Sequence, residues 1–289
     1  MRKVLIIGVN GMLGHTLADV ASKKFEVVGT CRKSMYHKKG VEIEKLDITD
    51  NNAVKSLILK HDPDLIVNCA AVTNVDFCED HPEIAYLVHV NGTKFLSNAA
   101  DKIGAKFVHI STDFVFDGNK GNYTEDDVPR PINVYGKTKY EGEKVVSNSA
   151  LVLRTCIYGW NILPKKSIVE WIIDEMKRTR SINLFNDSFF TPIYTCTFSK
   201  IILQMSKKNL KGLYHVGGSK KISKYNFALK VAEVFNLNKN LIKPISFKSV
   251  AKKAKRPRDT SLLCHKLKKE GFRLENVKKG LEAMKNDKI

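Results

Sequence analysis

Residues 4–21 read VLIIGVNGMLGHTLADVA, which is a short apolar run, a glycine-rich turn and a helical pattern. Gly8, Gly11 and Gly14 stand where a tight turn and a close backbone approach to a diphosphate are needed. The free N–H groups at the start of the following helix favour the same anion. Because the glycines follow a strand and open a helix, the stretch predicts a dinucleotide-binding βαβ unit. A tight turn without a ligand is the alternative.

The same alternation of apolar runs and helical patterns continues through the first half of the chain. Apolar runs predict strands at Val4–Ile7, Glu26–Cys31, Leu65–Cys69, Phe107–Ile110 and Leu151–Leu153. Helical patterns separate them at Leu13–Ala21, Val54–Leu59, Glu83–Ile103 and Tyr135–Val146. Strands rich in Val and Ile that alternate with helices are typical of a parallel sheet covered on both faces. The sequence therefore predicts a doubly wound α/β fold, the Rossmann arrangement.

The residues after the second predicted strand indicate which dinucleotide would bind. A site for NAD usually places an acid here to hold the ribose 2′-hydroxyl. This chain has Arg32, Lys33 and Ser34 instead, and these side chains could bind a 2′-phosphate. The pattern therefore favours NADPH, with NADH as the alternative, and a basic surface cluster is the reading without a ligand. Asp47 and Ile48, further along the chain, are placed to meet the adenine.

The stretch Tyr135-Gly-Lys-Thr-Lys139 carries the clearest catalytic pattern. Residues four apart share one face of a helix, so we expect Lys139 to lie near the Tyr135 hydroxyl. We expect this cation to lower the pKa of the phenol. A tyrosine tuned in this way suits proton donation to a carbonyl that is being reduced. Thr112, at the end of an earlier predicted strand, could hydrogen-bond the same carbonyl oxygen.

The composition excludes several other classes of protein. With 43% hydrophobic and 27% charged residues, the chain of 289 residues is of the globular type, neither disordered nor coiled-coil. Its six cysteines form no CxxC pair, so we expect no metal centre and no redox dithiol. The first apolar run is too short for a signal peptide, and no run is long enough to span a membrane. We therefore predict a cytoplasmic protein without a membrane partner.

The net charge of +19 is unevenly distributed along the chain. Residues 1–160 hold 20 basic and 20 acidic residues, whereas residues 161–289 hold 29 basic and 10 acidic ones. The sign fits a field that steers an acidic substrate, although most of the excess has the pattern of solvated surface lysine. The run Lys252–Arg258 resembles a nucleic-acid patch, but no aromatic residue interleaves with it. We therefore do not expect a nucleic-acid partner.

Taken together, the motifs resemble those of the extended short-chain dehydrogenase/reductases, and within them the dTDP-4-dehydrorhamnose reductase family. The resemblance runs nearly end to end and rests on the motifs as a set. They are Gly8–Gly14, Val67–Ala71, Ser111–Gly118, Asn133–Lys139, Leu153–Thr155, Asn186-Asp187 with Pro192, Gly212–Gly217 and Lys255–Leu262. One departure follows Arg154-Thr155, where this chain has Cys156-Ile157 and the family commonly shows Ser-Trp.

The resemblance implies that Thr112, Tyr135 and Lys139 form a catalytic triad. From the patterns and the resemblance together, the candidate cofactor residues are Gly8, Asn10, Gly11, Met12, Leu13, Gly14, Arg32, Lys33, Asp47, Ile48, Cys69, Ala70, Ala71, Asn91 and Thr155. The candidate substrate residues are Asp113, Phe114, Val115, Asn186, Arg256 and Arg258. Asn91 could anchor a water molecule or satisfy backbone groups, and the two arginines could face a phosphate.

The reaction implied by the resemblance is the NADPH-dependent reduction of the C4 ketone of a nucleotide-diphosphate-linked 4-keto-6-deoxy sugar. Such a step belongs to deoxysugar or cell-surface polysaccharide biosynthesis. We expect residues 1–155 to form an NADP-binding Rossmann domain, rejoined by part of residues 187–215. Residues 156–289 would then form a smaller, mixed α/β substrate-binding domain, and two copies could pair as a homodimer. The alternatives are a non-catalytic NADP-binding regulatory subunit, resembling that of methionine adenosyltransferase, and a sugar epimerase of the same superfamily.

Overall fold

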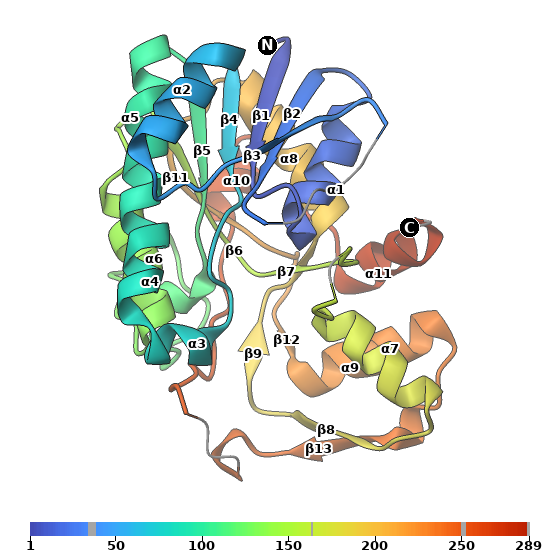
Figure 1. Ribbon diagram of the computed structural model, residues 1–289. Helices are drawn as coiled ribbons and strands as arrows, with labels where there is room; N and C mark the ends of the chain where they lie inside the picture. Colours follow the sequence, from blue (N-terminus) through green and yellow to red (C-terminus); the bar gives the residue numbers. More distant parts are fainter. Residues whose placement is uncertain (34–38, 163, 250–252, 288–289) are drawn as a thin grey trace.

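A parallel sheet forms the centre of the computed structural model, which describes residues 1–33, 39–162, 164–249 and 253–287 (Figure 1). Within these residues the sheet has seven strands in the order β11-β6-β5-β4-β1-β2-β3. Every pair of neighbours in it is parallel. The strands are β1 (Lys3–Ile7), β2 (Glu26–Cys31), β3 (Glu42–Lys45), β4 (Leu65–Asn68), β5 (Lys106–Ile110), β6 (Leu151–Thr155) and β11 (Gly212–Val216).

Helices cover both faces of the sheet, which confirms the predicted doubly wound fold. On one face lie α1 (Met12–Ala21) and α8 (Thr195–Lys207), and on the other lie α2 (Asn51–His61) and α5 (Thr93–Ile103) (Figure 1). Successive side chains of β1 point to opposite faces, since Val4 and Ile6 pack with α1 whereas Leu5 and Ile7 pack with α2. The strands are therefore apolar on both sides, as expected for a covered parallel sheet.

The predicted long helix over Glu83–Ile103 is wrong in its middle. There α4 (Pro82–Tyr86) and α5 are joined by a π-helical turn, Leu87–Gly92. A π-turn takes up an extra residue, which the apolar spacing of an α-helix does not reveal. Gly92 in this turn lies so close to Ile48 that a Cβ atom would come within 2.7 Å of the Ile48 side chain. The other predicted strands and helices are present, with bounds within a few residues of those expected.

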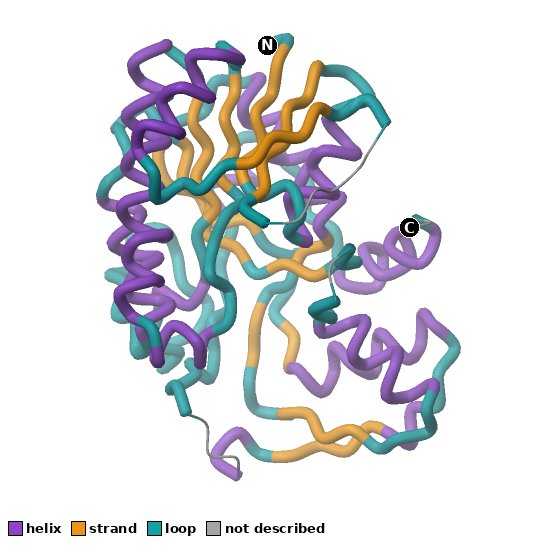
Figure 2. The backbone as a smooth tube through the Cα atoms, in the orientation of Figure 1, coloured by secondary structure: helices purple, strands orange, loops and turns teal. Residues whose placement is uncertain are grey.

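The second part of the chain builds a smaller unit beside the carboxyl ends of the strands (Figure 2). Its apolar core is formed largely by three helices, α7 (Ile168–Lys177), α9 (Lys224–Phe235) and α11 (Val277–Asn286). Two-stranded pairs complete it: β7 (Ile157–Tyr158) with β10 (Ile193–Tyr194), β8 (Ile182–Phe185) with β13 (Ile242–Ile245), and β9 (Phe189–Phe190) with β12 (Ile222–Ser223).

Three further helices are α3 (Val75–Asp80), α6 (Val134–Lys144) and α10 (His265–Lys269). The chain crosses between the two parts more than once, because α8 and β11 return to the central sheet after β7–β10. The proposed division at residue 155 stays a prediction.

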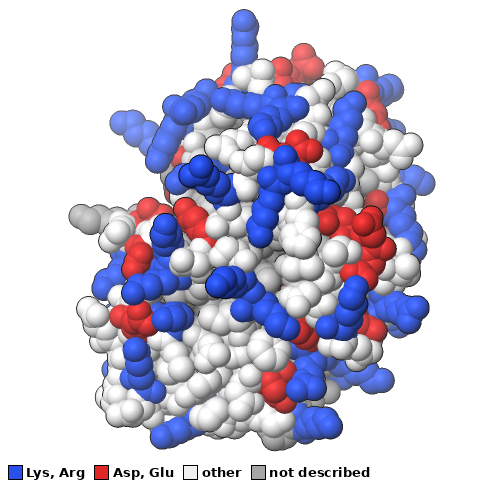
Figure 3. Space-filling view, turned by 180° about the vertical axis from the view of Figure 1, so that it is seen from behind, with Lys and Arg blue, Asp and Glu red and all other residues white. Residues whose placement is uncertain are grey.

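Charged side chains are widely spread over the surface. Figure 3 shows lysine and arginine side chains across the whole of one face, with acidic groups between them. The excess of positive charge on that face is therefore not gathered in a single groove. Lys252, the first residue of the basic run, lies outside the described residues, and so does Ser34. Among the described residues, no helix combines the length and the apolar character needed to cross a membrane.

Candidate active site

A cavity of about 710 Å³ opens at the carboxyl ends of the central strands. Residues at or just after the ends of β1, β2, β4, β5 and β6 line one wall, and these include Ile7, Cys31, Cys69, Ile110 and Thr155. The segment before α7 forms part of the opposite side. The cavity therefore lies where doubly wound proteins bind their ligands.

The glycine-rich turn forms one end of this cavity. Gly8 has φ +81°, and a Cβ on it would meet the backbone of Ala70 at 3.0 Å, so glycine fits this position best. Gly14 packs directly on the Gly8 carbonyl, which brings the start of α1 against the turn. Gly11 is the N-cap of α1 and also lines the cavity. The turn is therefore shaped to bring backbone N–H groups close to an anion.

Arg32 and Asp47 lie at the outer part of the same end, where both line the cavity. Asp47 Oδ1 accepts hydrogen bonds from the backbone N–H of Thr49 at 3.0 Å and from its hydroxyl at 2.8 Å. Burial alone would raise the pKa of the Asp47 carboxyl, but the bonds from Thr49 and the charge of Arg32 lower it. Asp47 is therefore an anion beside an exposed guanidinium.

Helix α6 carries Tyr135 and Lys139, and both line the cavity together with Thr112, which follows β5. Asn133 caps the helix, because its side-chain oxygen accepts from the backbone N–H of Gly136 at 2.8 Å. Gly136 itself packs against the Phe114 carbonyl, a contact that a side chain would obstruct. The cap and this glycine place Tyr135 on the first turn of α6, beside Thr112.

The charge relation within the triad differs from the prediction. Burial raises the pKa of the Tyr135 phenol, and a hydrogen bond with Thr112 only partly opposes this. The ammonium of Lys139 donates to the carbonyl of Ile110 at 2.7 Å. The expected net lowering of the Tyr135 pKa is therefore wrong, because burial outweighs any nearby cation and the spacing of the two residues does not reveal how deeply they are buried.

A buried ion pair between Arg154 and Glu143 lies near Lys139, and the sequence patterns did not predict it. Arg154 on β6 binds both carboxylate oxygens of Glu143, at 2.7 Å from Nη2 and 2.9 Å from Nε, and Ser111 donates to the same carboxylate. The two side chains are only 3% and 7% exposed. Burial lowers the pKa of Lys139 to about 8, while the charge of Glu143 raises it. Glu143 follows Lys139 by four residues on a predicted helix, which is the signal that was available.

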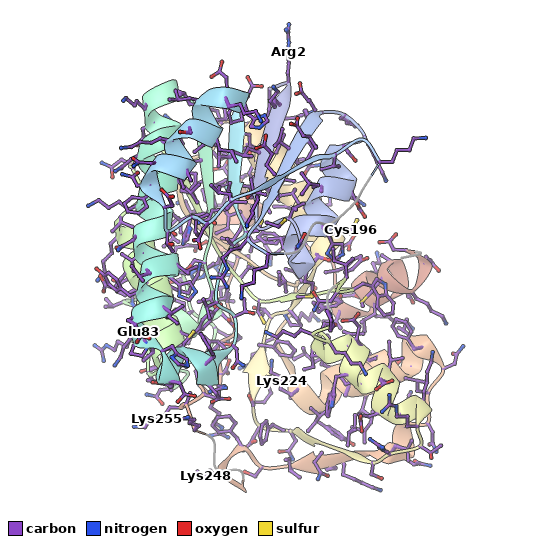
Figure 4. The ribbon with its side chains drawn as sticks, viewed as in Figure 1. Arg2, Glu83, Cys196, Lys224, Lys248 and Lys255 are labelled. Carbon is purple, nitrogen blue, oxygen red and sulfur yellow. The ribbon has the colours of Figure 1, made fainter. Side chains whose placement is uncertain are left out.

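Asp113 and Lys224 form a second charged group beside Tyr135. Asp113 lines the cavity, is 2% exposed and accepts a hydrogen bond from Thr260. Burial raises the pKa of Asp113 to about 6, and the positive charge of Lys224 counteracts this. Lys224 begins α9 (Figure 4), and its ammonium lies 3.2 Å from the centre of the Phe190 ring. Burial lowers the pKa of Lys224, and Lys224 is not among the residues that line the cavity.

The cavity brings together most of the predicted site. Besides the triad, it is lined by Gly8, Gly11, Met12, Leu13, Arg32, Asp47, Ile48, Cys69, Ala70, Ala71, Asp113, Phe114 and Thr155. The candidates that do not line it are Asn10, Gly14, Lys33, Asn91, Val115, Asn186, Arg256 and Arg258. Cys156 and Ile157, which mark the departure from the family pattern, line the cavity as well.

Three of the candidates outside the cavity, Asn186, Arg256 and Arg258, make their contacts in other parts of the structure. Arg256 binds Asp76 at 2.9 Å, and Arg258 donates to the carbonyl of Asp187 at 2.9 Å. Asn186 joins β8 to β13 through its backbone N–H, which donates to Ile245 at 3.1 Å. Their roles toward a substrate stay predictions.

Lys165 is a cavity residue that the sequence analysis did not find. It comes shortly before α7, whose N-cap Ser167 forms a capping box with Glu170. Its ammonium donates to the Thr73 hydroxyl at 2.9 Å, across the cavity from the strand ends. The Ser-x-x-Glu pattern of the capping box was the signal that places a helix start here.

One group of side chains has the composition of a cation site. Glu42, Glu44 and His61 place their ligand atoms within 4.8 Å of one another at the β3 edge of the sheet. However, Lys60 binds Glu44 at 2.5 Å and lowers the pKa of that carboxyl. An ammonium already occupies the carboxylate, so this group carries no argument for a metal.

A glycine-rich first turn and a Thr-Tyr-Lys set that line one cavity, on a seven-stranded parallel sheet, define the class of the extended short-chain dehydrogenase/reductases. Within that class the chain belongs to the dTDP-4-dehydrorhamnose reductase family, since a family model described as "RmlD substrate binding domain" matches residues 1–288.

Similar proteins include dTDP-4-dehydrorhamnose reductases and a subunit of a methionine adenosyltransferase. Methionine adenosyltransferase 2 subunit beta of Bos taurus is 33% identical over 282 residues, which cover 94% of this chain and 83% of the relative. The dTDP-4-dehydrorhamnose reductase of Aggregatibacter actinomycetemcomitans is 32% identical over 283 residues, or 91% of this chain and 90% of that one. The crystal structure of dTDP-4-dehydrorhamnose reductase from Bacillus anthracis in complex with NADP has a TM-score of 0.88 at 29% identity, covering 98% and 99% of the two chains.

Proposed function

We propose that this protein reduces the C4 ketone of a nucleotide-linked 4-keto-6-deoxy sugar with NADPH, as a dTDP-4-dehydrorhamnose reductase does, in deoxysugar or cell-surface polysaccharide biosynthesis. The observation that carries the proposal is a single cavity lined both by Thr112, Tyr135 and Lys139 and by the glycine-rich turn. A cytoplasmic location and a homodimer belong to the same proposal.

The wall of the cavity fits a phosphorylated dinucleotide. The close approach of Gly8 to Ala70 leaves room for backbone rather than side chain, as a bound diphosphate requires. Arg32, exposed at the mouth, would bind the 2′-phosphate through charge-assisted hydrogen bonds. When bound, NADPH supplies the hydride.

The chain's own residues then manage the proton and the developing charge. Burial keeps the Tyr135 phenol protonated at neutral pH, which is the state that a proton donor requires. Thr112, hydrogen-bonded with Tyr135, would bind and orient the ketone oxygen of the substrate, which accepts the proton from Tyr135. With a pKa of about 8, Lys139 is largely cationic at neutral pH and would stabilise the phenolate left after transfer. Asp113 and Lys224 would bind the hydroxyl groups of the sugar ring.

The test uses the purified protein, NADPH and a panel of dTDP-, UDP- and GDP-linked 4-keto-6-deoxy sugars. At least one sugar should drive NADPH oxidation with formation of the 4-hydroxy product. Tyr135→Phe should lower kcat by about a thousandfold or more, since it lacks the donated proton, while the Kd for NADPH stays within about twofold. Full activity in this variant would contradict the proposed proton donor. An epimerase would instead convert sugars without net oxidation of NADPH.

The similarity to methionine adenosyltransferase 2 subunit beta supports a second candidate, a regulatory subunit that binds NADP. The two readings differ in an observable way. A regulatory subunit would be recovered from its own cell lysate with a stoichiometric adenosyltransferase partner and would reduce none of the sugars. The presence of Thr112, Tyr135 and Lys139 in one cavity favours the enzyme.

A further inference from the structure

His89 lies in the π-helical turn Leu87–Gly92, between α4 and α5. Its side chain is 1% exposed, and its backbone carbonyl packs against Gly142 of α6 without room for a side chain there. Turns of this kind occur frequently at functional sites. His89 does not line the cavity, but both of its ring nitrogens make hydrogen bonds to residues of the site. One partner is Val72, which lines the cavity, and the other is Thr138, which lies between Tyr135 and Lys139 in the sequence.

The two hydrogen bonds of His89 determine where its proton lies. Nε2 is 2.9 Å from the backbone nitrogen of Val72, which can only donate, so Nε2 accepts. The proton is therefore on Nδ1, which donates to the Thr138 hydroxyl at 2.8 Å. Thr138 in turn donates to the Val134 carbonyl at 2.9 Å, one helical turn earlier. Burial and the nearby charge of Lys139 lower the pKa of His89 to about 3, so the ring stays neutral.

The groups at the two ends of this chain of bonds belong to different halves of the site. Val72 is part of the loop after β4 that forms the cofactor wall of the cavity. Thr138 stands on α6 between Tyr135 and Lys139, and the His89 ring meets the Tyr135 ring edge-on, with centroids 5.7 Å apart at 82°. One neutral imidazole thus joins the wall that would hold the nicotinamide to the helix that carries the proton donor.

We propose that His89 is a positioning residue that fixes the cofactor wall and the catalytic helix relative to each other, through one hydrogen bond to each. It touches neither the cofactor nor the reacting atoms. This inference rests on the proposed function, because its kinetic effect is measured on sugar reduction.

Two substitutions separate the two bonds, since asparagine places its amide near the position of Nδ1 and glutamine places its amide near that of Nε2. His89→Asn should keep the bond to Thr138 and lose the bond to Val72. We expect its Kd for NADPH to rise at least about fivefold while kcat falls less than about threefold. His89→Gln should keep the bond to Val72 and lose that to Thr138, so kcat should fall at least about tenfold at an NADPH Kd within about twofold. His89→Leu should show both losses.

His215 provides the matched control. It is also fully buried, and its Nδ1–H donates to the Tyr123 carbonyl at 3.1 Å, but it lies on β11 and does not line the cavity. His215→Asn and His215→Gln should both lower the melting temperature. The two variants should not differ from each other in their effects on the Kd for NADPH and on kcat. Equal effects of His89→Asn and His89→Gln on both quantities, or no effect of either, would overturn the inference and leave His89 a packing residue.

Thr138→Val keeps the test decisive if the His89 variants do not fold. It removes the acceptor on α6 and should reproduce the kcat loss of His89→Gln with an unchanged Kd for NADPH. Thr138→Ser retains the hydroxyl and should restore most of the activity, and failure of that rescue would count against the inference. If the wild-type protein reduces no sugar, the proposed function fails. The difference in NADPH affinity between His89→Asn and His89→Gln would still test whether the bond from Val72 to His89 positions the cofactor wall.

Discussion

The carboxylate of Glu143 holds a positive charge on Lys139, and its replacement by glutamine tests this coupling. Burial lowers the pKa of Lys139 from 10.5 to about 8, and the charge of Glu143 is the largest influence in the opposite direction. At a pKa of about 8, roughly nine tenths of the ammonium is charged at pH 7. The triad is therefore close to losing its cation just above neutral pH.

Glu143→Gln removes the negative charge and keeps an oxygen that can accept from Arg154. We expect the pKa of Lys139 to fall by roughly one unit, which corresponds to about 1.4 kcal/mol. About half of the ammonium would then be charged at neutral pH. Because only the protonated Lys139 stabilises the phenolate, the descending limb of kcat/KM should move from near pH 8 to near pH 7.

The assay is NADPH oxidation with the best sugar substrate from about pH 6 to about pH 10. Glu141→Gln is the matched control, since Glu141 is on the same helix but pairs with Lys144 at the surface, where it is 46% exposed. That variant should keep the wild-type profile. A limb that stays in place in Glu143→Gln, or moves upward, would refute the coupling. Circular dichroism checks that the variant is folded, because an unpaired buried Arg154 could cost about 3–5 kcal/mol.

Four other substitutions test the remaining assignments. Arg32→Ala should raise the Kd for NADPH at least about tenfold and leave that for NADH nearly unchanged; equal shifts in isothermal titration would show that Arg32 does not bind the 2′-phosphate. Arg256→Ala, and separately Arg258→Ala, should weaken nucleotide-sugar binding more than NADPH binding, and titrations identical to the wild type would leave both as surface ion pairs. Lys139→Met should abolish reduction yet stabilise the fold by up to about 3 kcal/mol at pH 7. The reason is that the pKa of this lysine is 10.5 in the unfolded state and about 8 in the folded one, so the unfolded state binds the proton more tightly. A lower free energy of unfolding in urea than that of the wild type would contradict this sign.

Local patterns were sufficient to predict five of the seven strands described in the sheet, all except β3 and β11, and several residues of the site. Apolar runs separated by helical patterns predict the order of strand and helix, because each buried strand must be apolar on both faces. The glycine-rich turn and the spacing of Tyr135 and Lys139 are equally local, and the cavity contains both. The family resemblance added Thr155 and the loop after β4, which no pattern of spacing alone would have selected.

Contacts between distant parts of the chain could not be predicted in this way. Lys224 lies near Asp113 only because α9 packs beside the carboxyl ends of the strands, more than a hundred residues later in the sequence. Arg256 has the composition of a phosphate ligand, yet the fold pairs it with Asp76. The π-helical turn around His89 has the same apolar spacing as a continuous helix, so its geometry is visible only in three dimensions.

One physical cause, burial, sets the protonation of the catalytic end. It raises the pKa of Tyr135, raises that of Asp113 to about 6 and lowers that of Lys139 to about 8. Each shift favours the uncharged form, so Tyr135 is ready to donate a proton but its phenolate is costly in the same surroundings. A nearby cation must offset that cost, and Lys139 serves only while Glu143 keeps it protonated. The Glu143–Arg154 pair is thereby coupled to proton transfer, although neither side chain lines the cavity.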